Sequence, residues 1–443
     1  MRIWEWLRPG IKVKRWIFLA LLGIFFIVIG IAGLVYYRDF GLGHIAFWGM
    51  INLIGGFIIY VSGVGGVRSI VALINKGYLK LSLDKNNVEN LIYEKRLLIQ
   101  GPKIVVIGGG TGLSTMLRGL KYYTSNITAI VTVADDGGSS GDLREELGML
   151  APGDIRNCIL ALADTEPLME ELLQYRFTDG RLKNHSFGNL FLAAMDGISD
   201  NFEDAVQKMS SVLAVTGKVL PVTLDDMKLK ARFKNGSVVE GESIIPKEAL
   251  AQGTSIDKMM IIPEEAKALP DAIDAIMDAD AVIIGPGSLY TSIIPNLLVK
   301  DITDALRKCN ALKIYVSNIM TQPGETDGYT AADHVKAIMD HSHKDIIDYV
   351  IGNVELLDKE LREKYLKEGS TLVTFDRREL EKLGVKIIEA NLVKVKKELV
   401  RHDADYLARV LAETIMEKKL LYDKKRILEY MYLSERIRTS KTH

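Results

Sequence analysis

Two glycine-rich loops, each directly after a strand-like run, are the segments of this chain best suited to bind a phosphate. They are GGGTGLS (108–114) and DDGGSSG (135–141). Glycine lets backbone N–H groups approach phosphate oxygens, and a following helix presents its positive N-terminus. Paired carboxylates hold a metal ion or a ribose hydroxyl. The two loops therefore predict a nucleotide-binding crevice, with Asp135 and Asp136 as candidate ligands of a metal ion or a ribose hydroxyl.

Three further loops bring polar groups to the start of a helix. APGDIRN (151–157) offers a guanidinium and an amide, NHSFGNL (184–190) precedes another helical stretch, and GPGSLYTS (285–292) follows an apolar run. A helix cap is the simpler explanation of Asp154, and His185 taken alone is an ordinary hydrogen-bonded histidine. Loops of this kind after successive strands favour one shared crevice for a phosphorylated ligand.

The residues leave two readings of this crevice open. In a dinucleotide-dependent oxidoreductase, Asp135 or Asp136 would hold the adenosine ribose at the end of the second strand. A phosphate or metal-phosphate site explains more, because the small donors in 137–141 have no role in a ribose clasp. The sequence contains no P-loop motif, so P-loop phosphoryl transfer is unsupported.

Alternating strand-like and helical segments must position these loops. The alternation predicts a Rossmann-like α/β domain, in which a parallel sheet carries helices on both faces. The strand-like runs are 104–107, 129–133, 281–284 and 313–316. Residues 219–262 instead show short alternating runs around Asn235-Gly236, a hairpin signal, and predict a small antiparallel insert.

The first 75 residues have a different character. Two uncharged apolar stretches, 16–37 and 45–67, are each long enough to span a bilayer. Basic residues lie before the first and after the second, and all four tryptophans lie in or beside them, as expected at membrane interfaces. The sequence therefore predicts a transmembrane hairpin over 1–75, in the cell membrane, with both termini and the main domain in the cytoplasm.

The other boundaries follow from composition. A mixed-charge segment at 76–102 predicts a juxtamembrane linker, the α/β domain is expected over 103–415, and 416–443 has the pattern of a basic C-terminal helix. The stretch from about Arg401 onward is expected to be helical. Its apolar stripe is expected to pack on the domain or on a second copy of the chain, with an anionic lipid surface as the alternative.

The overall composition excludes several classes of protein. Of 443 residues, 48% are hydrophobic and 26% are charged, which is typical of an ordered chain. Lysine plus arginine (56) nearly equals aspartate plus glutamate (57), so no nucleic-acid partner is expected. The two cysteines, Cys158 and Cys309, have neither C-x-x-C spacing nor a histidine pair nearby, so no zinc site or disulfide framework is predicted.

Five motifs, in order, resemble one bacterial family. They are GGGTGLSTMLRGLK, TVADDGGSSGDLREELGMLAPGDIRNCILALAD, HSFGNLFLAAM, GPGSLYTSIIPNLLV and SNIMTQPGETDGYTAADHV. From about Lys103 to Arg401 the chain resembles the gluconeogenesis factor family, YvcK type, within the CofD-like group that includes 2-phospho-L-lactate transferase. The resemblance implies a Rossmann-like, cytoplasm-facing protein that binds a UDP-sugar such as UDP-N-acetylglucosamine. It also implies an influence on cell shape and envelope synthesis during gluconeogenic growth.

The same resemblance implies roles for single residues. Asp135 and Asp136 would occupy the metal-phosphate position of the transferases, which use Mg²⁺. Tyr365 would stack on uracil, and Arg401 would pair with a phosphate. The remaining residues that match phosphate-contacting and crevice-lining positions of the family are Gly109, Gly110, Thr111, Gly112, Asn189, Gly285, Gly287 and Ser288.

Three functional hypotheses follow. The first is a membrane-tethered UDP-sugar-binding regulator without catalysis, which acts on a protein of cell-envelope synthesis. The second is a magnesium-dependent transferase that acts on a nucleotide-activated substrate, with Asp135 and Asp136 as the metal ligands. The third is the oxidoreductase, for which the sequence offers no identifiable hydride-transfer residue. The N-terminal hairpin departs from many members of the family and favours membrane attachment.

Overall fold

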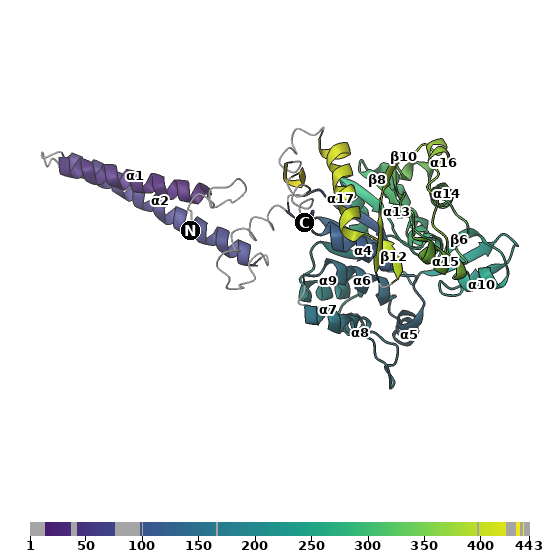
Figure 1. The fold of residues 1–443 in the computed structure, drawn as a ribbon. Helices are drawn as coiled ribbons and strands as arrows, with labels where there is room; N and C mark the ends of the chain where they lie inside the picture. The colour runs from purple at the N-terminus through teal and green to yellow at the C-terminus, as the bar shows by residue number, and fades with distance from the viewer. Residues whose placement is uncertain are drawn as a thin grey trace. The chain divides into compact units, whose positions relative to one another are not determined.

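The chain divides into two compact units, Met1–Ile99 and Gln100–His443 (Figure 1). The computed structural model describes residues 14–36, 42–75, 98–99, 101–164, 167–396, 398–421, 431–434 and 437. Most of the predicted linker 76–102 and most of the predicted C-terminal helix 416–443 therefore lie outside the described residues. Within the latter segment, a π-helical turn, η4 (Met416–Leu420), continues the preceding helix, and residues 431–434 are helical.

The first unit contains two long apolar helices, α1 (Lys14–Tyr36) and α2 (Leu42–Asn75). Gly23 and Gly55 allow their backbones to approach closely, since a Cβ on either residue would lie within 3 Å of the other's carbonyl oxygen. Large side chains such as Phe25 and Leu53 point outward and are more than half exposed. Phe18–Tyr36 and Ile45–Gly65 are long and apolar enough to cross a membrane.

The second unit is built on a seven-stranded sheet in which every neighbouring pair is parallel. In spatial order the strands are β10 (Lys386–Ala390), β9 (Tyr349–Asn353), β8 (Leu312–Val316), β7 (Ala281–Ile284), β1 (Ile104–Gly108), β2 (Ile127–Val131) and β3 (Lys218–Pro221). The central strands are rich in Val and Ile and buried throughout, because helices cover both faces of such a sheet. The Rossmann-like fold class predicted from the sequence is confirmed.

Helices follow most strands of this sheet. The main ones are α4 (Gly110–Leu120), α5 (Gly138–Leu147), α6 (Pro152–Leu162), α7 (Pro167–Gln174), α8 (Phe187–Asp196), α9 (Phe202–Val212), α11 (Pro270–Met277), α12 (Ile294–Leu298), α13 (Lys300–Lys308), α14 (Ala331–His341), α15 (Lys359–Lys367), α16 (Arg377–Lys382) and α17 (Ala404–Ile415). The chain adds strands in one direction after β1 and in the other after β7. Right-handed crossovers therefore place α4 and α13 on opposite faces of the sheet.

A small antiparallel sheet is inserted between β3 and β7. It consists of β4 (Lys228–Phe233), β5 (Val238–Glu240) and β6 (Ile256–Ile262), with α10 (Ile245–Ala251) before β6. The predicted turn at Asn235-Gly236 joins β4 and β5, and Gly236 has the left-handed φ of +87° that glycine adopts readily.

Two boundaries expected from the sequence are wrong. The insert was expected to begin at residue 219, yet Lys218–Pro221 is β3, which pairs parallel with β2. A helix was expected from Arg401 onward, yet β11 (Val393–Lys396) and β12 (Leu399–His402) form an antiparallel hairpin that includes Arg401. Both segments are short. Pairing with the distant strand β2 overrides the local pattern of β3, and pairing with the adjacent strand β11 makes Leu399–His402 a strand.

Gly119 of α4 provides a test of this packing, because a Cβ there would lie 2.2 Å from the carbonyl oxygen of Ala404 in α17. We expect Gly119→Ala to lower the free energy of unfolding by about 1–3 kcal/mol, since the two backbones must separate. The matched Gly197→Ala, whose Cβ would have its nearest neighbour at 3.6 Å, should change it by less than about 0.5 kcal/mol. Denaturant unfolding of the full chain in detergent measures both, and equal effects would contradict the close approach.

Candidate functional site

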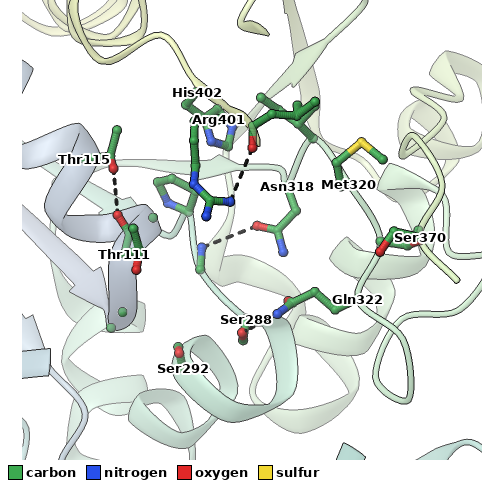
Figure 2. A pocket seen from close by; sticks show the side chains of 18 of the residues that line it. Thr111, Thr115, Ser288, Ser292, Asn318, Met320, Gln322, Ser370, Arg401 and His402 are labelled. Carbon is green, nitrogen blue, oxygen red and sulfur yellow. Dashed lines mark hydrogen bonds between the residues drawn. The ribbon is translucent and has the colours of Figure 1, made fainter. Parts of the chain in front are cut away.

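A cavity of about 380 Å³ lies where the order of the parallel strands reverses, between β1 and β7 (Figure 2). Loops at the carboxyl ends of β1, β7 and β8 line it, together with Tyr365, Ser370 and strand β12. Ligands of open parallel sheets bind at this kind of reversal, because neighbouring loops there diverge to opposite faces and leave a crevice. The cavity is of the size that holds a small ligand.

The first wall is the N-terminus of α4. Gly110 has a φ of +69°, which suits glycine, and the extended Gly109 before it supplies no side-chain cap. Gly109, Gly110, Thr111 and Gly112 all line the cavity. The first turn of the eleven-residue helix therefore presents backbone N–H groups and the positive end of its dipole to a ligand.

The second wall comes from the loops after β7 and β8. Asn318 accepts a hydrogen bond from the backbone N–H of Gly287 at 3.4 Å, and Gln322 Nε2 donates to Ser288 Oγ at 2.6 Å. Figure 2 shows Asn318 and Gln322 pointing toward the β7 loop from the opposite side. These two contacts fix the loop after β7 against the turn that follows β8.

The third wall is the β11–β12 hairpin. The backbone N–H of Val400 donates to the Tyr365 hydroxyl at 2.8 Å, which ties β12 to α15. His402 is held by a 3.1 Å hydrogen bond to the carbonyl oxygen of Ser317, and burial lowers the pKa of His402 to about 4. His402 is therefore neutral near pH 7. Arg401 is the single formal charge among the residues that line the cavity.

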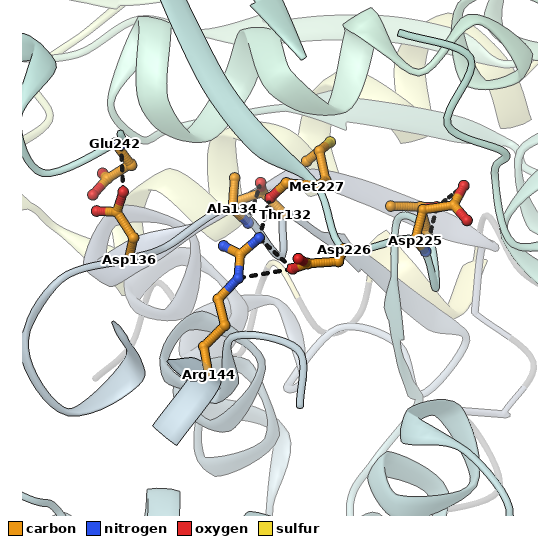
Figure 3. A network of polar contacts seen from close by, with 9 residues as sticks. Thr132, Ala134, Asp136, Arg144, Asp225, Asp226, Met227 and Glu242 are labelled. Carbon is orange, nitrogen blue, oxygen red and sulfur yellow. Dashed lines mark hydrogen bonds and ion pairs between the residues drawn. The ribbon is translucent and has the colours of Figure 1, made fainter. Parts of the chain in front are cut away.

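Asp136 lies outside this cavity. Its two carboxylate oxygens accept the backbone N–H groups of Glu242 and Ser243, each at 2.8 Å, in the turn before α10. Figure 3 shows this contact beside a second one, in which Arg144 of α5 pairs with Asp226. Asp136 joins the loop after β2 to the turn before α10, and Arg144 joins α5 to the segment between β3 and β4. Asp136 therefore holds the insert.

Asp135 and Asp154 form a carboxylate pair on the other side of Gly109. A Cβ on Gly109 would lie 2.5 Å from Asp154 Oδ2, and a Cβ on Gly153 would lie 2.7 Å from Asp135 Oδ2. Burial and the neighbouring Asp135 charge raise the pKa of Asp154 to about 7. Asp154 Oδ1 would lie 4.0 Å from a Cβ on Gly110, so Asp154 lies beside the first turn of the helix that lines the cavity.

Two carboxylates are suitable partners for Mg²⁺ when phosphates and waters complete the shell. Among the described residues, no group of three or more His, Cys, Asp or Glu side chains is arranged to hold a metal. If a metal binds here, Asp154 is a better partner for Asp135 than Asp136, whose oxygens are both occupied by backbone donors.

Asn189 belongs to a separate polar cluster at the start of α8. Its side chain donates to Ser139 Oγ at 3.1 Å, and Ser139 lies 3.1 Å from His185 Nδ1. Ser186 caps α8 by accepting the Asn189 N–H and also receives a hydrogen bond from Arg156. The cluster fixes α5, α6 and α8 to one another and contributes no residue to the cavity lining.

The structure thus brings together most, not all, of the residues singled out from the sequence. Tyr365, Arg401, Ser288, Gly287 and the four residues 109–112 line one cavity. Gly285, Asp135, Asp136 and Asn189 lie outside its lining. The sequence reasoning missed Asn318, Gln322 and Ser370, although the first two belong to one of the motifs that carry the family resemblance.

A buried acidic group lies beneath the β7 loop. The Thr291 hydroxyl donates to Glu325 at 3.5 Å, and Glu325 is 6% exposed. Burial raises the pKa of Glu325 to about 7, and burial with the nearby charges of Asp135 and Asp136 raises the pKa of Glu242 to about 8. Both carboxyl groups are therefore partly protonated near neutral pH.

The comparisons with known proteins agree with this architecture. A family model described as 2-phospho-L-lactate transferase CofD matches residues 104–393. A gluconeogenesis factor homologue of Clostridium acetobutylicum is 61% identical and covers 100% of this chain and 98% of its own. The gluconeogenesis factor of Bacillus subtilis is 50% identical over 72% of this chain and 99% of its own.

A crystal structure of a UPF0052 family protein from Bacillus halodurans has a TM-score of 0.67 and 46% identity, over 70% of this chain and 98% of that one. The parallel sheet and the matching family model define a CofD-like protein of Rossmann type. Within that class, this chain belongs to the gluconeogenesis factor family, as its motifs predicted.

Glu325→Gln tests the protonation of the acidic group. The folded-state pKa of about 7 lies above the ordinary value near 4.5, so the stabilisation from the bound proton is complete below pH 4.5 and is lost as pH rises through 7. The neutral amide avoids this loss, and we expect the variant to be more stable than the wild type at pH 8.5 by about 1–3 kcal/mol. The difference should shrink toward pH 5.

Denaturant unfolding of the full chain at both pH values measures this effect. The exposed Glu360 provides the control, because Glu360→Gln removes the same charge without a buried environment. A gain at pH 8.5 that Glu360→Gln reproduces would assign the effect to net charge instead of burial.

Proposed function

We propose that this chain is a membrane-tethered receptor for a UDP-sugar, of the UDP-N-acetylglucosamine class, and that ligand occupancy regulates envelope synthesis and cell shape during gluconeogenic growth. The observation that carries the proposal is the cavity itself. It combines a helix N-terminus with Arg401 and has no carboxylate among its lining residues. Such a site suits a diphosphate ester, which carries two negative charges.

The charge balance favours binding without a metal ion. A nucleoside triphosphate requires more positive charge than one guanidinium and a helix dipole supply, and enzymes commonly provide it with lysine and Mg²⁺. The lining has no lysine, and the neutral His402 adds no charge at pH 7. The positive charge of one guanidinium and a helix dipole matches the smaller negative charge of a nucleotide sugar.

Tyr365 supplies the apolar surface for the base. It is 9% exposed, it lines the cavity, and its hydroxyl is already held by β12. An aromatic ring fixed in this way can stack on uracil at little cost in conformational entropy. The same hydrogen bond couples the ring to Arg401, the next residue after Val400.

The apolar hairpin supports the tether. Its outward side chains would expose a large apolar surface to water, which proteins avoid unless lipid or a partner covers it. The Clostridium acetobutylicum homologue aligns with the whole chain, the hairpin included. Attachment to the cytoplasmic face of the membrane would keep the receptor beside envelope synthesis.

A transferase is the second candidate, because the Asp135–Asp154 pair adjoins the phosphate-binding helix. In that case the two carboxylates would hold Mg²⁺, which would supply Lewis acidity toward a phosphate. Burial and the adjacent Asp135 charge raise the pKa of Asp154, and a cation between the two carboxyl groups would remove this like-charge repulsion. This candidate requires the nucleotide to be consumed.

Calorimetric titration of the full chain in detergent tests the receptor. We expect UDP-N-acetylglucosamine to bind in EDTA as well as in Mg²⁺ and to be recovered intact. Arg401→Ala should weaken binding about 10- to 100-fold, because a charge-assisted contact to phosphate is lost. The control Arg378→Ala removes an exposed arginine of α16 and should leave affinity unchanged. Consumption of the nucleotide would establish the transferase instead, and preferential binding of NAD would exclude both.

Fractionation of cells tests the tether. We expect the full chain to remain in the membrane pellet after alkaline carbonate, since two spans of about twenty apolar residues insert stably. A chain that begins at Gly101 should move to the supernatant. Release of the full chain by carbonate would show that the hairpin does not span the bilayer.

A further inference from the structure

We propose that Asn318 is a ligand-contacting residue that selects for the diphosphate, through hydrogen bonds from its amide nitrogen to a phosphate oxygen. The inference rests on the proposed function, because it assumes that the cavity takes a UDP-sugar. Asn318 lies just beyond the carboxyl end of β8, and neither its type nor its spacing singled it out in the sequence.

The orientation of the Asn318 amide is set by the protein. Its oxygen accepts the backbone N–H of Gly287 at 3.4 Å, from the loop after β7. An amide is planar, and the nitrogen must therefore point away from that contact. Figure 2 shows the nitrogen on the side of the amide that is turned toward Gln322 and Ser288, away from Arg401.

Within the described part of the chain, no protein group accepts a hydrogen bond from Asn318 Nδ2. A polar group at a partly buried site is costly when it lacks a partner, unless water or a ligand supplies one. The nitrogen carries two N–H groups, so the ligand atom that it meets must be an acceptor. Uracil carbonyls and phosphate oxygens both qualify on this criterion alone.

The surroundings favour phosphate. Asn318 faces the N-terminal turn of α4 across the cavity, and the Arg401 guanidinium lies near both (Figure 2). Donors from three elements around one cavity, together with one positive charge, suit an anionic ligand. The Gly287 N–H is occupied by Asn318 Oδ1, so the loop after β7 loses one backbone donor. The amide nitrogen of Asn318 supplies a hydrogen-bond donor to the cavity instead of the Gly287 N–H.

The neutral amide of Asn318 affects which nucleotides the cavity prefers. Asparagine binds a phosphate oxygen without adding positive charge, and the lining keeps the single charge of Arg401. A second cation would strengthen the binding of free nucleoside di- and triphosphates, which carry more charge than the sugar ester. We therefore expect Asn318 to help the site hold a nucleotide sugar in the presence of more highly charged nucleotides.

The test uses the full chain in detergent and compares UDP-N-acetylglucosamine, UDP and uridine. Asn318→Asp keeps the shape and the oxygen that receives the Gly287 N–H, but places an anion where the amide nitrogen was. At pH 8 we expect about a 100-fold loss of affinity for the two diphosphates. Asn318→Ala should lose about tenfold, the effect of one neutral hydrogen bond in a partly buried site. Binding of uridine at millimolar concentration should be unchanged in both variants.

The pH dependence separates contact from simple support of the loop. Lowering the pH toward 4.5 should restore part of the affinity of Asn318→Asp, because a bound phosphate raises the pKa of the new carboxyl above its ordinary value of about 3.9, while Asn318→Ala stays weak. The matched control is Asn201→Asp, the same substitution at the N-cap of α9, where aspartate caps equally well. The control should bind all three ligands like the wild type.

Each outcome decides the proposal. Equal losses for uridine and the diphosphates, or unchanged affinity in both variants, would overturn the role of Asn318 while the receptor function stands. Failure of the wild type to bind any UDP compound would overturn both. Thermal unfolding of the variants shows whether a loss reflects misfolding, and Asn318→Ala provides the second measurement if Asn318→Asp fails to fold.

Discussion

The reversal of strand order between β1 and β7 is the constraint on which the rest of the second unit depends. In a parallel sheet all carboxyl ends lie at one edge, and right-handed crossovers send the connections on either side of the reversal to opposite faces. The loops after β1, β7 and β8 are thereby separated just enough to leave a cavity. Their glycines and small polar residues then decide what it holds.

Gly109 divides the crevice into two chemically different halves. On one side lies the cavity with Arg401 and neutral donors, and on the other lies the Asp135–Asp154 pair, which approaches so closely that no larger residue fits at 109. Asp154 thus lies beside the helix turn that lines the cavity, while its own side chain stays outside the lining. The backbone at Gly109 separates the two halves.

The remaining walls come from segments distant in the sequence. Tyr365 and the β11–β12 hairpin follow β9 and β10, and they are held in place by a main-chain hydrogen bond to the tyrosine hydroxyl and by the contact of His402 with Ser317. Burial keeps His402 neutral, and so its role is to position β12. Arg401 is left to carry the charge.

The sequence by itself determined the elements whose pattern is local. Apolar runs before glycine loops predicted β1, β2, β7 and β8, Asn235-Gly236 predicted a hairpin, and two uncharged stretches predicted α1 and α2. The sequence also determined the family, because long motifs that occur in a fixed order can be compared between chains without knowledge of the tertiary structure. The strands β3, β9 and β10 and the β11–β12 hairpin were not predicted. Although β9 and β10 are as long as β1, no glycine-rich loop directly follows any of these strands to mark its end.

Only the tertiary structure decided which candidate residues share a site. Asp135 and Asp136 are adjacent in sequence, yet one faces Asp154 and the other holds the insert, because side chains at successive extended positions point in opposite directions. Asparagine is a common residue in ligand-binding sites, but the Asn189 side chain instead belongs to the polar cluster that fixes three helices to one another. Asn318 and Gln322 belong to one of the family motifs, yet their place in the cavity was not predicted. It depends on the loop that each one contacts, and that neighbour is set by the order of strands in the sheet.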